Sequence, residues 1–127
     1  VEPRGANSMS QSMVANKPVT LDSVNTIADS LAPPMALPFS YSICKEFVDQ
    51  FVTVTDDQIC AGLFLLQEEC KLAVEPAAGA VLAGAIWPLR NKLAGKKIGL
   101  IICGANIDAQ SYEKFLKQGY EKVKDEL

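Results

Sequence analysis

The residues best suited to chemistry form a short turn that follows an apolar run. Cys103-Gly104-Ala105-Asn106 comes directly after Ile98-Gly99-Leu100-Ile101-Ile102. A run that is apolar on both faces is typical of a central strand in a parallel sheet. Ligands of open α/β sheets bind beyond the carboxyl ends of such strands, where small residues let a flat ligand approach the backbone. The pattern predicts either a ligand site or a plain strand-to-helix turn that uses the conformational freedom of Gly104.

The residue types that are missing exclude several kinds of enzyme. The 127 residues contain no histidine, which excludes Ser-His and Cys-His nucleophile pairs and removes the commonest metal ligand. The four cysteines stand singly, without a Cys-x-x-Cys pair, at positions 44, 60, 70 and 103. We interpret them as reduced thiols of a cytosolic protein.

Composition and charge limit the partners. With 49% hydrophobic residues the chain can build one buried core. Its 12 basic and 15 acidic residues give a net charge of −3 without a basic block, so we expect no nucleic-acid partner. Gly, Pro or a charge interrupts every apolar stretch, so we expect no membrane span.

The two ends of the chain carry possible targeting signals. Val1-Glu2-Pro3 is neither an initiator methionine nor part of a signal peptide, so the chain is expected to begin within a longer protein. Lys124-Asp125-Glu126-Leu127 matches the tetrapeptide that retains proteins in the endoplasmic reticulum. We interpret this ending as the last turn of an amphipathic helix and expect a cytoplasmic protein.

Periodicity places the turn within alternating elements. We expect irregular backbone over residues 26–32, because no apolar period is visible and Pro33-Pro34 follows. The order of the elements is typical of an α/β fold. The predicted helices cover residues 8–15, 42–49, 55–70, a stretch from Pro76 onward and a last helix capped by Ser111, and the predicted strands cover 51–54 and 98–102.

Local signals support the helix assignments. Thr55-Asp56-Asp57-Gln58 is a capping box, and Pro76 suits a first turn. Small residues after Pro76 would let that helix approach a sheet closely. The expected buried faces are Ile59, Leu63, Leu66 and Cys70 on one helix, and Tyr112, Leu116, Tyr120 and Val123 on the last.

Four segments resemble, in order and spacing, the C-terminal half of the threonine/serine dehydratases and serine racemases. This group belongs to the type II, tryptophan-synthase-β-like, pyridoxal-phosphate enzymes. The resemblance implies that residues 1–127 form a single partial domain, the C-terminal portion of a large domain with a three-layer, mostly parallel sheet flanked by helices. The segments are Val1-Glu2-Pro3 with Gly5-Ala6-Asn7-Ser8-Met9, Thr26-Ile27-Ala28-Asp29, Lys71 to Gly79, and Cys103 to Asp108.

The resemblance implies a cofactor site. Cys103 would hydrogen-bond the pyridine nitrogen of pyridoxal 5'-phosphate, and Gly104, Ala105 and Asn106 would complete that wall. Glu75 matches a glutamate at the edge of the cofactor pocket, although it could equally stabilise a helix N-terminus. Ser30 stands where the family keeps a glycine near the substrate side of the cofactor.

A cation site is also implied. Glu2, Ala6 and Ser8 align with positions that hold a divalent cation, Mg²⁺ or Ca²⁺, in the racemase and in some dehydratases. Ser8 stands where the racemase has an acidic ligand, and hard cations prefer charged oxygen.

The implied function is an L-threonine/L-serine ammonia-lyase of amino-acid metabolism, a homodimer that converts a β-hydroxy amino acid to a 2-oxo acid and ammonia. No lysine here has the family's Ser-Phe-Lys context, so no residue is assigned as catalytic and the chain alone is expected to be inactive. Serine racemase, or another β-hydroxy amino acid lyase of the family, is the first alternative. A non-catalytic α/β binding or interaction domain and a remnant left by proteolysis are the others.

Overall fold

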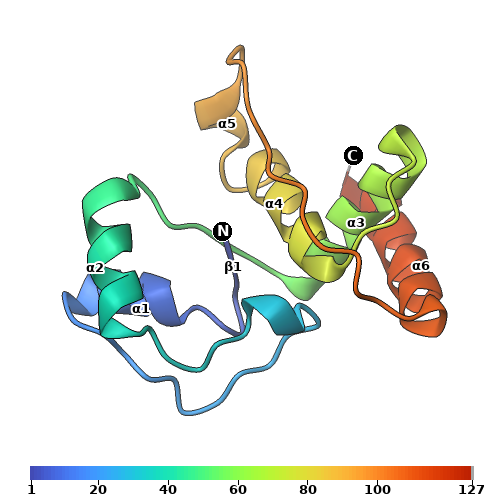
Figure 1. Cartoon of the computed structure of the whole chain (residues 1–127). Helices are drawn as coiled ribbons and strands as arrows, with labels where there is room; N and C mark the ends of the chain where they lie inside the picture. The colour runs from blue at the N-terminus through green and yellow to red at the C-terminus, as the bar shows by residue number, and fades with distance from the viewer. Residues whose placement is uncertain (127) are drawn as a thin grey trace.

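The computed structural model describes residues 1–126, and Leu127 lies outside the described part. Two strands and seven helical segments follow one another along the chain. They are β1 (Glu2–Pro3), α1 (Ser8–Ala15), the 3-10 turn η1 (Asp29–Leu31), α2 (Pro38–Phe47), β2 (Thr53–Val54), α3 (Asp56–Cys70), α4 (Pro76–Ile86), α5 (Arg90–Leu93) and α6 (Ala109–Glu126). Figure 1 shows α3, α4 and α6 grouped on one side of the molecule and α1 with α2 on the other.

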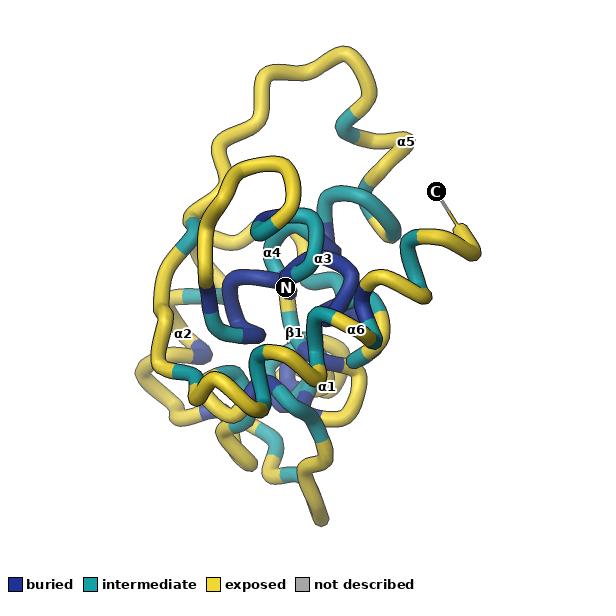
Figure 2. Tube along the Cα trace, turned by 90° about the vertical axis from the view of Figure 1, so that its right-hand side faces the viewer, coloured by how far each residue is buried: buried dark blue, intermediate teal, exposed yellow. Residues whose placement is uncertain are grey.

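The core lies where α3 packs against α4 on one side and α6 on the other. In Figure 2 the buried trace follows α3 and α4 closely. Two clusters of buried apolar side chains fill this region, one of them extended by half-buried residues of α6. The first comprises Ala28, Val54, Ile59, Ala80 and Ala83, and the second Leu63, Leu66, Val74 and Ala78.

Glycines allow α3 and α4 to touch backbone to backbone. A Cβ added to Gly62 would lie 2.1 Å from the Gly79 carbonyl oxygen, and one added to Gly79 would lie 2.5 Å from that of Ile59. The small residues of α4 therefore serve the purpose expected of them, a close approach, but the partner is a helix and not a sheet.

The two strands pair in parallel, with Glu2 opposite Thr53 and Pro3 opposite Val54. The Glu2 N–H donates to the Val52 carbonyl at 2.9 Å, and the Arg4 N–H donates to the Val54 carbonyl at 2.7 Å. The strand predicted over 51–54 is thus present in its second half. Parallel pairing between strands so far apart in sequence is typical of α/β folds.

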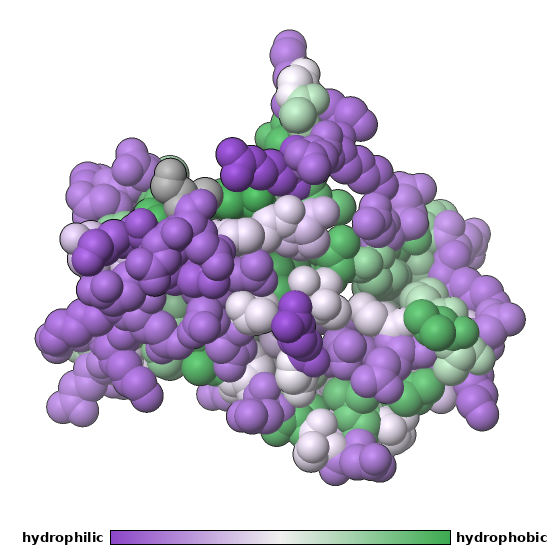
Figure 3. Space-filling model, turned by 180° about the vertical axis from the view of Figure 1, so that it is seen from behind, coloured by the Kyte–Doolittle hydropathy of each residue, from purple (hydrophilic) through white to green (hydrophobic). Residues whose placement is uncertain are grey.

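The strand predicted over 98–102 is not formed. This segment has no strand partner within the described residues, and Ile98 and Ile101 are 48% and 79% exposed. A strand forms only where its backbone pairs with a neighbouring strand through hydrogen bonds, so an apolar run without such a neighbour stays irregular. Together with α4 and α5 this segment lines a mostly apolar groove. Figure 3 shows apolar surface exposed in hollows on the rear face of the molecule.

Several helix boundaries differ from the prediction. α2 begins at Pro38 instead of residue 42, because proline is tolerated in a first turn. Cys70 is exposed and not buried, because α3 ends there and Lys71 turns the chain with φ 58°. Asp108, and not Ser111, caps α6, since its carboxylate accepts from the N–H groups of Gln110 and Ser111.

Other predictions are confirmed. α1 spans the expected residues 8–15, and α4 begins at Pro76. The capping box of α3 is complete, because the Gln58 N–H donates to Thr55 Oγ1 and the Thr55 N–H donates to Gln58 Oε1. Ile59, Leu63 and Leu66 are buried, whereas the inner face of α6 is only half-buried and Tyr120 is 50% exposed.

Among residues 1–126, no helix combines the length and the apolar character needed to cross a bilayer.

Cys60 should resist thiol reagents while the protein is folded. Its burial, reinforced by the nearby Asp56 and Asp57 carboxylates, raises its pKa from 9.0 to about 12, so little reactive thiolate exists at pH 8. We expect iodoacetamide at pH 8 to label Cys44, Cys70 and Cys103 but not Cys60, as read by peptide mass spectrometry. In urea all four should react, and labelling of Cys60 in the folded chain as fast as Cys70 would contradict this assignment.

Gly62→Ala should destabilise the chain by about 1–3 kcal/mol, because the new methyl group overpacks the α3–α4 contact. Gly99→Ala is the matched control, since a Cβ at Gly99 meets nothing within 4 Å. Urea denaturation of both variants measures the difference. Equal midpoints would mean that α3 and α4 do not approach as described.

Candidate functional site

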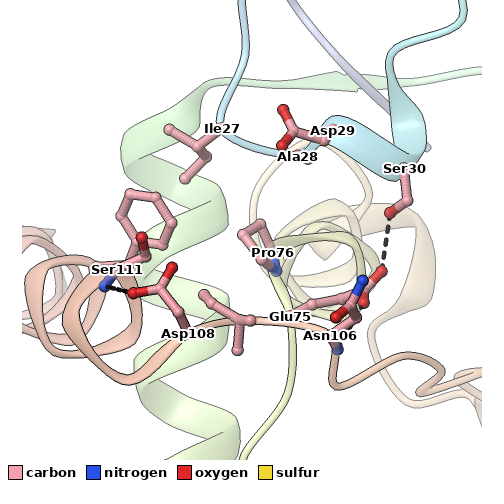
Figure 4. Close-up of a pocket in the computed structure, with 11 residues that line it drawn as sticks. Ile27, Ala28, Asp29, Ser30, Glu75, Pro76, Asn106, Asp108 and Ser111 are labelled. Atoms are coloured by element: carbon pink, nitrogen blue, oxygen red, sulfur yellow. Dashed lines mark hydrogen bonds between the residues drawn. The ribbon is translucent and has the colours of Figure 1, made fainter.

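A cavity of about 390 Å³ opens between η1, the start of α4 and the turn that leads into α6 (Figure 4). Three segments that are far apart in the sequence form its walls. The lining residues are Ile27, Ala28, Asp29, Ser30, Glu75, Pro76, Asn106, Ile107, Asp108, Ser111 and Phe115.

The Glu75 side chain connects all three walls. Ser30 Oγ of η1 donates to Glu75 Oε1 at 2.8 Å, and the Asn106 N–H donates to Glu75 Oε2 at 3.0 Å. The backbone N–H of Glu75 donates in turn to the Gly104 carbonyl at 3.2 Å. Figure 4 shows the Ser30 hydroxyl pointing at this carboxylate. One half-buried acid therefore holds η1, α4 and the 103–106 turn together.

Gly104 is required by this arrangement for two reasons. Its φ of 82° lies in the left-handed region that side chains disfavour. A Cβ on Gly104 would also lie 2.4 Å from the carboxyl carbon of Glu75. The carboxylate thus occupies the space that a side chain at position 104 would need.

The 26–28 segment, which forms the opposite wall, is held by the first residue of α3. Thr26 Oγ1 donates to Asp56 Oδ1 at 2.7 Å, and the Ile27 N–H donates to Asp56 Oδ2 at 3.1 Å. The Ala28 N–H donates to Thr26 Oγ1, and Ala28 itself is buried. Of the irregular backbone predicted over 26–32, residues 26–28 are irregular as expected, whereas residues 29–31 form the 3-10 turn η1. The position of 26–28 is set by α3.

Asp108 contributes an ionised group to the cavity edge. Hydrogen bonds from the side chain and the backbone N–H of Ser111 hold the pKa of Asp108 below its usual value. A negative carboxylate at a helix N-terminus is attracted to the positive end of the helix dipole, so Asp108 stabilises the start of α6.

Of the residues expected to bind the cofactor, the structure brings four together. Ser30, Glu75 and Asn106 line the cavity, and Gly104 contacts Glu75. Cys103 and Ala105 lie on the same turn with exposed side chains and are not among the lining residues. The assignment of all six residues to a cofactor stays a prediction.

The predicted cation ligands lie apart from this cavity. Glu2 Oε1 accepts from the Met9 N–H at 2.9 Å, and Glu2 Oε2 accepts from the N–H and the hydroxyl of Ser10. Ser8 Oγ donates to the Pro33 carbonyl at 3.2 Å. Within the part of the chain that the structure describes, no three acidic, cysteine or histidine side chains gather as metal ligands would. The cation site at Glu2, Ala6 and Ser8 stays a prediction.

Sequence reasoning assigned no role in a site to several lining residues, nor to Asp56 and Asp108, the acids that hold the 26–28 segment and the start of α6. Asp108 could have been found from its place one residue before the last helix, a preferred capping position. Asp56 could not, because the capping box already explained an acid in that turn. Ile27 and Pro76 lie within segments that carry the family resemblance but were assigned no role in a site, and Phe115 carries no signal beyond its apolar character.

The chain resembles known proteins over nearly its whole length. Residues 1–104 match the family model described as pyridoxal-phosphate dependent enzyme. The chain is 40% identical over 94% of its length to a phenylserine dehydratase from Ralstonia pickettii. It is 36% identical over 93% of its length to a serine racemase from Schizosaccharomyces pombe. It covers 36% of each of these relatives, so it spans about a third of their length.

Solved structures extend the comparison to the fold. The processed form of threonine deaminase isoform 2 from Solanum lycopersicum matches with a TM-score of 0.83 and 29% identity, covering 92% of this chain and 34% of that one. Maize serine racemase matches with a TM-score of 0.79 and 31% identity, covering 92% and 38%. These matches, with the parallel pairing of β1 and β2, confirm the predicted α/β fold class.

Asp56→Ala should release the 26–28 segment and destabilise the chain by about 1–3 kcal/mol, because two donors lose a charged acceptor. Asp57→Ala is the matched control, since it removes an acid from the same helical turn and loses only an exposed contact with Gln118. Urea denaturation and amide exchange of residues 24–30 measure the effect. Equal stability of the two variants would contradict the role of Asp56.

Proposed function

The chain belongs to the pyridoxal-phosphate dependent enzymes, and from this membership we propose that the protein is an ammonia-lyase of β-hydroxy amino acids. Threonine or serine would give a 2-oxo acid and ammonia. The observation that carries the proposal is the 40% identity, over 94% of the chain, to a relative named as a dehydratase.

The residues present fit the cofactor. In the 103–106 turn Ala105 is exposed and carries only a methyl group, so a flat ring could lie close to it. The neighbouring cavity of about 390 Å³ has the size of a small-molecule site. Cys103 has an exposed side chain and is therefore available to a ligand.

The cofactor supplies an electron sink for the bond-breaking step, whereas this chain supplies its surroundings. The neutral Cys103 thiol would hydrogen-bond the ring nitrogen without forcing its protonation, which favours β-elimination over transamination. Gly104, Ala105 and Asn106 would form the wall beside the ring. Glu75 would keep this wall in place through the Asn106 N–H and the Gly104 carbonyl.

The group that takes the α-proton is proposed to lie in another part of the protein. No lysine here occurs in a Ser-Phe-Lys context. The proposal includes a homodimer, which the family resemblance implies. It also includes a cytoplasmic location, which the single cysteines and the interpretation of the C-terminal residues as a helix end favour. A divalent cation at Glu2, Ala6 and Ser8 is a finer part of the proposal, and the Glu2 carboxylate, its one charged ligand, also accepts hydrogen bonds from the first turn of α1.

Serine racemase is the second candidate. The 36% identity to the Schizosaccharomyces pombe racemase and the match to the maize enzyme favour it. The products separate the two activities, since a racemase interconverts the serine enantiomers and a dehydratase releases 2-oxo acid and ammonia.

The test uses the complete protein with pyridoxal phosphate. Wild type should develop an absorbance band that borohydride abolishes, and should release 2-oxo acid from L-threonine, L-serine or phenylserine. Formation of D-serine without 2-oxo acid would favour the racemase, and no band with excess cofactor would favour a binding domain.

Cys103→Ala should lower kcat/KM about tenfold, the equivalent of one hydrogen bond of about 1.4 kcal/mol. Cys103→Ser should retain most activity, because a hydroxyl is also a neutral partner for the ring nitrogen. Cys70→Ala, which removes another exposed thiol, is the control. Equal kcat/KM values for Cys103→Ala and Cys70→Ala would remove Cys103 from the cofactor site.

A further inference from the structure

Ser30 places a hydroxyl where the family resemblance implies a glycine. This hydroxyl donates to Glu75 Oε1 at 2.8 Å, across 45 residues of sequence. A glycine at position 30 could not make this contact. The link between η1 and Glu75 therefore depends on the side chain at position 30.

The hydrogen bond from Ser30 orients the Glu75 carboxylate toward the 103–106 turn. A carboxylate has two oxygens in one plane, so fixing Oε1 at Ser30 directs Oε2 to the Asn106 N–H, 3.0 Å away. Without the hydroxyl the carboxyl group would be held by the Asn106 N–H alone, and that N–H would have a less steadily placed acceptor.

Steric contact couples the same carboxylate to Gly104. The space beside the Gly104 α-carbon is filled by the carboxyl carbon and both oxygens of Glu75. A shift of the carboxylate would thus open a gap next to a residue held at φ 82°. The conformation of the turn depends on where the carboxylate sits.

We propose that Ser30 is a positioning residue, which acts through the Glu75 carboxylate to set the conformation of the 103–106 turn and thereby the affinity for a flat heteroaromatic cofactor. The affinity part of this inference rests on the proposed function. The positioning part rests on the hydrogen bonds and the steric contact alone.

The size of the effect follows from the exposure of the bond. A hydrogen bond to a carboxylate is stronger than one between neutral groups, but Ser30 is exposed and water can replace its hydroxyl. We expect Ser30→Ala to weaken cofactor binding about three- to tenfold, less than the loss of a fully buried contact would cause.

The first measurement is amide hydrogen exchange of residues 103–108 in the complete protein without cofactor. Ser30→Ala should exchange several-fold faster there, whereas Ser30→Thr, which keeps the hydroxyl, should match wild type. Ser42→Ala is the control, because Ser42 is exposed and its hydroxyl bonds only the Phe39 carbonyl in its own helix.

The second measurement is the dissociation constant of pyridoxal phosphate, from the absorbance and fluorescence of the bound cofactor in the same four proteins. Only Ser30→Ala should bind more weakly. In a Glu75→Ala background the Ser30→Ala change should have no further effect, because its acceptor is gone.

Unchanged exchange of residues 103–108 in Ser30→Ala would overturn the proposal, whether or not the cofactor binds. An effect of Ser30→Thr as large as that of Ser30→Ala would also overturn it, because the hydroxyl would not be responsible. Faster exchange in Ser30→Ala together with no cofactor binding by wild type would support the positioning role and refute the proposed function.

Discussion

The close contact between the backbones of α3 and α4 is the constraint on which the rest of the structure depends. Gly62 and Gly79 leave no room for a side chain between the helices, so the two helices are fixed relative to each other. Asp56 begins α3 and Glu75 directly precedes α4. These two acids hold the 26–28 segment and the 103–106 turn, so a packing contact in the core sets the separation of the cavity walls.

The acids around the cavity act as acceptors for backbone and hydroxyl donors. Asp56, Glu75 and Asp108 each accept at least one backbone N–H at the start of a helix or in a loop. Such donors have no partner within the helix or turn itself, and a carboxylate satisfies them well. The acids of this chain thus hold the walls of the cavity in place.

The sequence was a good guide where the signal is local and a poor one where it is not. The capping box at Thr55 and the start of α4 at Pro76 follow from a few neighbouring residues. The apolar run 98–102 also carries a strand signal, but pairing needs a partner that the run itself does not specify. The bond between Ser30 and Glu75 joins residues 45 positions apart, and only the folded chain brings them together.

The short connection between α3 and α4 also bears on the order in which this chain folds. The two helices are neighbours in the sequence, so their contact closes a small loop at little entropic cost. The pairing of β1 with β2, by contrast, joins residues 2–3 to residues 53–54. Such non-local pairing is slow. The helical core would therefore form first and serve as the template on which β1 and β2 pair.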